Sequence, residues 1–191
     1  MLLLVLAATA AFFFWNFVVE KKEETTEKLQ PVAIASGVTG FEAQVANSLA
    51  AYLAMKDAFV KSDTAIVNQS AAAFGHSLHS LDFNQLQTDS SLVKLAGELN
   101  QEIVVAAGLI LSAGNIEAKR APFETVSNKM FDLLRIVQYK GSKVYQQYCP
   151  MAFDDKGATW LSADTEIMNP YFGKKMLHCG EIQDSLRFAN P

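Results

Sequence analysis

The sequence predicts a mainly α-helical fold: an up-and-down four-helix bundle, followed by a small irregular C-terminal lobe that contains short β-strands. Apolar residues recur every three or four positions for about a hundred residues after Phe41, a spacing typical of helices with one buried face. After Gly141 this spacing stops, and short aromatic and β-branched runs alternate with turn residues. Four helices joined by short connections favour an up-and-down bundle.

The first two helices have clear boundary signals. The first runs from about Phe41 to Lys61, and Asp63 can cap the second with its side chain. Met55 belongs to this pattern and is expected to be ordinary core. The other residues predicted to face the core here are Phe41, Val45, Leu49, Tyr52, Leu53, Phe59, Val60, Ile66, Ser70, Ala73, Phe74, Ser77, Leu78 and Leu81.

The third helix is predicted from about Ser90 to Ala113, where Gly114 ends it. Asn115 can cap a fourth helix that runs to about Tyr139, and Pro122 should either kink this helix or mark its true start. The predicted inward residues are Leu92, Leu95, Ala96, Leu99, Ile103, Ala106, Ala107, Ile110, Ile116, Phe123, Met130, Leu134 and Val137.

The lobe begins at about residue 142. Residues 144–148 and 159–161 are rich in aromatic and β-branched side chains, which predicts two brief strands. Asn169-Pro170 and Gly173 are strong turn signals. We therefore expect residues 39–191 to form one domain, with the lobe laid against the bundle.

The N-terminus is predicted to interact with a membrane. Residues 1–19 are apolar except for Thr9 and Asn16, and a helix of that length nearly spans the hydrocarbon of a bilayer. The small residues Ala8 to Ala10 also fit a signal-peptide cleavage site, and a buried core helix is a third alternative. Residues 20–38 read as a polar linker. The hydrophobic segment predicts that the rest of the chain is exported, either anchored in the membrane or secreted after cleavage.

Composition excludes several classes of function. The net charge is −4 and no basic face is evident, which argues against a nucleic-acid partner. Neither a phosphate-binding loop nor a dinucleotide pattern is present. No acid–base pair stands out, so a binding protein is expected rather than an enzyme.

Two short segments of the lobe carry soft sulfur ligands. In an extended segment Cys149 and Met151 would point to the same side, and in a helical turn Met176 and Cys179 would share a face. If the intervening turns bring the segments together, two thiolates and two thioethers converge, a set that suits Cu(I). His178 and Met168 are possible additional ligands.

Other arrangements of the same cysteines remain open. Cys149 and Cys179 can form a disulfide, which would stabilise an exported domain by roughly 3–4 kcal/mol in the chain-entropy model. His76 and His79 lie three residues apart on the second helix and could complete a Cys₂His₂ zinc site, although a surface position is the simpler interpretation.

The lobe resembles a known bacterial family, domain-of-unknown-function family 3347. The resemblance is carried by Tyr148-Cys149-Pro150-Met151-Ala152-Phe153, Gly157-Ala158, Trp160-Leu161-Ser162, Ile167, Asn169-Pro170-Tyr171-Phe172-Gly173, Met176-Leu177 and Cys179-Gly180. It extends back to about Phe41 through residues 52–58 and through Arg120, Phe123 and Ser127. Pro122 and His178 depart from the usual pattern.

The resemblance implies a role in metal handling. Domains of this kind occur alone or attached to periplasmic adaptor proteins of heavy-metal efflux pumps, which implies copper or a related soft metal as the cargo. A ligand role then falls to Cys149, Met151, Met176 and Cys179, and a metal efflux or delivery protein becomes the expected partner. The alternative function is a disulfide-stapled helical interaction module without metal.

Overall fold

The computed structural model describes residues 40–86 and 88–188, which lie within one compact unit, Ile34–Pro191. The predicted anchor (1–19) and linker (20–38) lie outside the described residues. The elements in chain order are α2 (Gly40–Lys61), α3 (Thr64–His79), a 3₁₀ turn (Phe83–Gln85), α4 (Ser90–Ser112), α5 (Ile116–Ile136), β1 (Val144–Cys149), α6 (Ala152–Asp155), β2 (Ala158–Ser162), a second 3₁₀ turn (Gly173–Lys175) and β3 (Glu181–Leu186).

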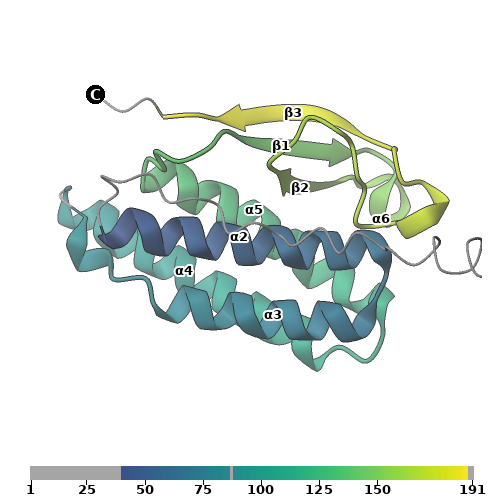
Figure 1. The fold of residues 1–191 in the computed structure, drawn as a ribbon, viewed down its shortest axis with the longest axis horizontal. Coiled ribbons are helices and arrows are strands. Elements are labelled where there is room, and N and C mark those ends of the chain that lie inside the picture. The colour runs from purple at the N-terminus through teal and green to yellow at the C-terminus, as the bar shows by residue number, and fades with distance from the viewer. Residues whose placement is uncertain (1–39, 87, 189–191) are drawn as a thin grey trace, which may run out of the picture. The chain divides into compact units, whose positions relative to one another are not determined.

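The four predicted helices are confirmed. They follow one another up and down, with α3 packed between α2 and α4, and α4 packed on α5 (Figure 1). Asp63 caps α3 by accepting from the backbone of Ala65 and Ile66, each at 3.0 Å. Asn115 likewise caps α5 by accepting from Ala118 at 2.9 Å. A helix start at Pro122 is wrong, because α5 begins at Ile116 and runs through the proline.

The core follows the predicted stripes with four corrections, one of which is Ala73, which is exposed. Ile66, Leu92 and Leu95 were expected inside but are 43%, 39% and 42% exposed. In α3 the buried face lies one residue later, on Val67, Ala71, Phe74 and Leu78. One residue turns a helix by about 100°, so a stripe that mixes small and large residues does not fix the inward direction. Met55 and Met130 are fully buried, as predicted.

Among the described helices, α4 is long and apolar enough to cross a membrane by length and composition alone. One face of this helix packs against α3 and α5 in the bundle. Its buried residues are Ala96, Leu99, Ile103, Ala106, Ala107 and Ile110, all of which the periodicity predicts.

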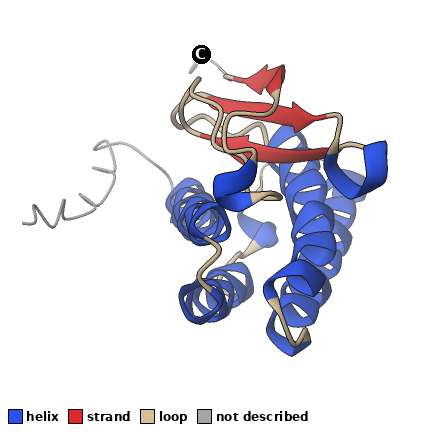
Figure 2. Ribbon diagram, turned by 90° about the vertical axis from the view of Figure 1, so that its right-hand side faces the viewer, coloured by secondary structure: helices blue, strands red, loops and turns tan. Residues whose placement is uncertain are grey.

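The lobe contains an antiparallel sheet in the order β2-β1-β3. The two predicted strands are confirmed with slightly wider bounds, whereas β3 was not predicted. Four of the six β3 residues are exposed, so this edge strand lacks the alternation of buried and exposed residues that marks a strand in a sequence. Figure 2 shows the sheet over one side of the bundle, where β2 contacts α5 and α2.

A buried tyrosine joins the sheet to the bundle. The Tyr52 hydroxyl of α2 accepts from the Leu161 backbone N–H of β2 at 3.0 Å. It lies 2.7 Å from the Ser127 hydroxyl, which donates to the Phe123 carbonyl in α5. Because Ser127 uses its own proton in that bond, Tyr52 donates to Ser127. This chain connects three elements through groups that are removed from water.

Candidate functional site

The two cysteines meet at the end of the sheet. Cys149 is the last residue of β1, pairs with Ala158 of β2, and is fully buried. Cys179 lies two residues before β3 and is half-buried. Their Sγ atoms are 2.9 Å apart, and both are free thiols in this structure. The predicted convergence of the two segments is therefore confirmed for the cysteines.

Asn169 holds the second cysteine in place. Its backbone N–H donates to the Leu177 carbonyl at 2.7 Å, and its side-chain Nδ2 donates to the Cys179 carbonyl at 2.7 Å. Its Oδ1 accepts from the Tyr171 N–H at 2.8 Å. Asn169 is fully buried, so these bonds form away from water, where an unmade bond is expensive. The sequence predicted a turn here but not this clamp.

The loop between β2 and β3 is also fastened at two other points. Gln147 of β1 donates through Nε2 to the carbonyls of Asp164 and Glu166, at 3.0 and 2.9 Å. Arg120 of α5 donates through Nε to the Pro170 carbonyl at 3.2 Å and is paired with Glu117. Sequence reasoning missed Gln147, since one glutamine in a strand carries no signal of its own.

Glycine allows the segment after Cys179 to lie against the sheet. Gly180 has φ +145°, and a Cβ at this position would lie 2.8 Å from Cη2 of Trp160. Only a residue without a side chain fits against the indole at that backbone angle. The fully buried Trp160 ring therefore lies next to the cysteine segment.

The contact between the thiols changes the acidity of Cys179. The hydrogen bond with Cys149, together with burial and repulsion from that neighbour, raises the pKa of Cys179 to about 11. At neutral pH Cys179 is therefore protonated. A metal ion must displace this proton, because the thiolate is the form that ligates.

The spacing of the sulfurs tests how well the pair fits a metal ion. With a metal–sulfur distance of about 2.3 Å, taken from zinc thiolates, sulfurs 2.9 Å apart would subtend only about 80° at the ion. Tetrahedral or linear coordination needs a wider angle, and the sulfurs must separate by roughly 1 Å or more. Such a movement would have to come from a rotation of the Cys179 side chain, which is half-buried and follows a turn. Both donors are soft sulfurs, which suits a soft cation.

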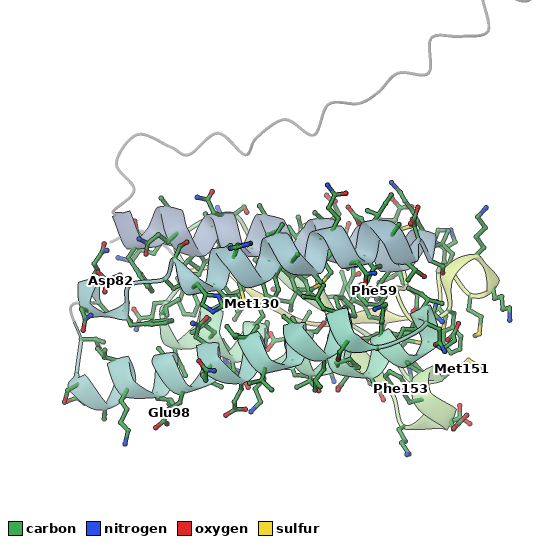
Figure 3. The ribbon with its side chains drawn as sticks, turned by 90° about the horizontal axis from the view of Figure 1, so that it is seen from below. Phe59, Asp82, Glu98, Met130, Met151 and Phe153 are labelled. Carbon is green, nitrogen blue, oxygen red and sulfur yellow. The ribbon has the colours of Figure 1, made fainter. Side chains whose placement is uncertain are left out.

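Met151 does not extend the site in the way that the sequence suggested. The prediction required extended backbone through Met151, but β1 ends at Cys149 and Met151 has helical angles, φ −87° and ψ −6°. Its side chain is 49% exposed and lines a cavity of about 860 Å³, whose lining includes neither cysteine. Figure 3 shows Met151 and Phe153 at one end of the bundle.

Met176 and Cys179 are joined by a backbone turn, but not by the helical turn that was predicted, because Met176 has φ −141° and ψ 50°. The Cys179 N–H donates to the Met176 carbonyl at 3.1 Å, which closes a turn and brings the two residues together along the backbone. The other two possible ligands, Met168 and His178, differ in exposure. Met168 is half-buried beside Asn169, and the exposed His178 lies with Nδ1 3.0 Å from the Ile167 carbonyl.

The zinc site with His76 and His79 is not formed. Both histidines are exposed in the last turn of α3, and Nδ1 of His79 lies 2.7 Å from the Gly75 carbonyl. Asp82, three residues after His79, lies at the end of the bundle opposite Met151 (Figure 3). Over residues 40–86 and 88–188, no three His, Cys, Asp or Glu side chains gather closely enough to hold a metal ion.

Comparison with known proteins gives one finding. No curated protein and no solved structure matches the chain. A family model described as "Protein of unknown function (DUF3347)" matches residues 49–141. The match spans most of α2, all of α3 to α5 and ends before β1, so the lobe with its cysteines lies outside it. Through this helical region, the chain belongs to the DUF3347 family of proteins of unknown function.

Proposed function

We propose that this protein is an exported, membrane-tethered helical domain that captures a soft metal ion, Cu(I) in particular, for metal handling or efflux. The observation that carries the proposal is the pair of free thiols, Cys149 and Cys179, whose sulfurs lie 2.9 Å apart on two different segments. Two thiolates that converge from distant positions form a chelate, and soft sulfur donors favour Cu(I) over hard cations.

The surroundings support a capture site. Cys149 belongs to the central strand of the sheet, while Cys179 lies on a turn fixed by the buried Asn169. One ligand is therefore held rigidly, and the other can adjust to the ion. Met176 adds a thioether within the same turn. The bundle would serve as the scaffold that docks on an efflux or delivery protein, and residues 1–19 would direct the chain to the periplasm.

Copper competition tests the proposal. Full-length reduced protein in detergent is titrated anaerobically with Cu(I) against a chromophoric chelator. We expect one tightly held ion per chain, and loss of that ion in the double variant Cys149→Ser/Cys179→Ser. The variant His76→Ala/His79→Ala is the control and should bind as the parent does, because these histidines lie in α3 rather than in the lobe. Full copper retention by the double serine variant would remove the proposal.

The same short distance favours a second candidate, a disulfide-stapled interaction module without metal. A disulfide needs sulfurs about 2.05 Å apart, so closing the pair requires a smaller movement than chelation does. Mass spectrometry of protein isolated from the periplasm without reductant separates the candidates. A quantitative loss of two hydrogens supports the staple, whereas free thiols or bound copper support capture.

A further inference from the structure

A cavity of about 860 Å³ lies at the end of the bundle where Figure 3 labels Met151 and Phe153. This volume is within the range of about 300–1,000 Å³ that is usual for small-molecule sites. Aromatic rings form part of its wall, from Phe153 in the α6 turn and from Tyr171 and Phe172 in the loop before β3. The lining of the cavity includes neither cysteine, so this feature is separate from the thiol pair.

The cationic residues of the cavity come from three elements that meet at Ser62. Arg120 of α5 donates through Nη2 to the Ser62 hydroxyl at 3.2 Å. Gly173, with φ +55°, lies so close to this serine that a Cβ on the glycine would overlap the hydroxyl oxygen. The 3₁₀ turn Gly173–Lys175 is thereby set against the end of α2. The cationic side chains that this packing brings to one cavity are those of Lys61, Arg120, Lys174 and Lys175.

Most of this positive charge is not neutralised within the domain. Lys61, Lys174 and Lys175 are exposed and form no ion pair with any residue in 40–86 or 88–188. Arg120 is only 5% exposed and is paired with Glu117, so these two charges offset each other. The ammonium groups of the three lysines therefore remain able to bind an anion, and such charge-assisted hydrogen bonds are stronger than neutral ones.

The α6 turn forms another wall of the cavity and carries an aromatic ring beside two carboxylates. Phe153, Asp154 and Asp155 line the cavity with φ of +54°, +56° and +63°, left-handed conformations that cost free energy in residues other than glycine. The Gly157 N–H closes the turn by donating to the Ala152 carbonyl at 2.9 Å. Strained residues of this kind cluster at sites that hold ligands.

From these walls we infer that the cavity is a binding site for a small organic anion with an aromatic body, an aryl phosphate or an aryl carboxylate. The anionic head group binds the lysine ammonium groups and the Ser62 hydroxyl. The ring of the ligand lies against Phe153 and Tyr171, whose own rings pack edge to face with centroids 5.4 Å apart. The carboxylates of Asp154 and Asp155 oppose the anion and lower its affinity. Binding here does not involve the thiol pair and is independent of metal capture.

Calorimetric titration of the full-length protein in an uncharged detergent tests the ligand class. Phenyl phosphate carries both parts of the ligand, inorganic phosphate lacks the ring, and benzyl alcohol lacks the charge. We expect saturable one-to-one binding of phenyl phosphate, and affinities at least about tenfold lower for the other two probes, since each makes only part of the contacts. No saturable binding of phenyl phosphate would overturn the inference, and so would equal affinity for either of the other probes.

Substituting the lysines of the 3₁₀ turn tests where the anion binds. We expect Lys174→Gln/Lys175→Gln to weaken phenyl phosphate binding by about fivefold, in line with the modest strength of exposed charge pairs. Lys140→Gln/Lys143→Gln is the matched control, because it makes the same change in net charge at exposed positions that do not line the cavity. The control should stay within about twofold of the parent, since salt screens distant charges. An unchanged affinity in the first variant, or an equal loss in the control, would show that the anion does not bind in this cavity.

Removing the opposing carboxylates gives a test with the opposite sign. Asp154→Asn/Asp155→Asn should strengthen phenyl phosphate binding severalfold, because two negative charges leave the wall of the cavity. Asparagine accepts the left-handed backbone of these positions, so the turn is kept. An unchanged or weaker affinity in this variant would exclude an anion beside the α6 turn and overturn the inference.

Discussion

Single residues decide where the thiols lie. Asn169 links the turn after Met168 to the Cys179 carbonyl, and Gly180 lets the next residues pass against Trp160. Neither Asn169 nor Gly180 is a proposed ligand, yet both set the position of Cys179, which is one. The contact of Cys179 with Cys149 has a consequence for reactivity, because it raises the pKa of Cys179.

Alkylation of Cys179 measures that effect. With a pKa of about 11, the reduced Cys179 thiol is protonated at pH 8 and should react slowly with iodoacetamide, faster as the pH rises toward 11. Cys149→Ala removes the hydrogen bond and the repulsion, so the pKa of Cys179 should fall toward the ordinary value of about 8.5. The rate at pH 8 should then rise severalfold, as followed by mass spectrometry. Equal rates in parent and variant would contradict the coupling of the two thiols, and urea-unfolded samples provide the control for reagent and pH.

At the scale of elements, strand β2 is attached to the helices of the bundle by hydrogen bonds between a few buried or partly buried polar groups. Tyr52 bonds to Leu161 of β2 and Ser127 of α5, while Thr159 of β2 bonds to Asn128 of α5. Burial raises the pKa of the Tyr52 hydroxyl, so it remains a hydrogen-bond donor over the accessible pH range. Removing this hydroxyl leaves the buried N–H of Leu161 without its partner.

Tyr52→Phe should therefore lower the free energy of unfolding by about 1–3 kcal/mol, the usual penalty for an unpaired buried polar group. Urea unfolding of residues 34–191 followed by circular dichroism gives the value. Tyr139→Phe is the matched control, because the Tyr139 side chain is also buried and, within the described residues, its hydroxyl makes no hydrogen bond to another residue. Its effect should stay within about 0.5 kcal/mol. Equal effects of the two substitutions would show that the Tyr52 network adds no stability.

At the scale of the described domain, the lobe has little core of its own and completes its burial against the bundle. The aromatic rings of Phe123 in α5 and Tyr171 in the lobe lie 5.9 Å apart, and Tyr171 also contacts Trp160 at 6.0 Å. Arg120 adds a polar link from α5 to Pro170. A three-stranded sheet with such contacts depends on the helices for its stability.

Bundle and lobe should consequently unfold together. In residues 34–191 the only tryptophan is Trp160, so its fluorescence reports on the lobe while circular dichroism at 222 nm reports mainly on the helices. We expect thermal transitions from the two probes to coincide, as in a two-state domain. A fluorescence transition clearly below the helical one would show that the lobe unfolds independently. Arg120→Met, which removes the link to Pro170, should lower both midpoints without separating them.

Local signals in the sequence determined the helices and the outline of the lobe. Asp63 and Asn115 fix helix starts through bonds within their own turn, and apolar spacing fixes most of each buried face. Such signals mislead where apolar residues lie on more than one face of a helix, and they are missing where a strand has no alternation of buried and exposed residues. Ile66 and Leu95 are apolar but point to solvent, and β3 lacks alternation because four successive residues, which belong to both of its faces, are exposed. Pro122 did not begin a helix, since the Asn115 cap had already started one.

The sequence by itself determined which residues could carry soft-metal chemistry, because ligand type is a property of the side chain. Only the tertiary structure decided which of them meet. Cys149 and Cys179 are brought together by strand pairing and by the buried clamp of Asn169, which act across 30 positions of the chain. Met151 was separated from the pair by the reversal of the backbone after β1, although it is only two residues from Cys149. The position of a ligand depends on backbone direction and long-range contacts, and sequence spacing fixes neither.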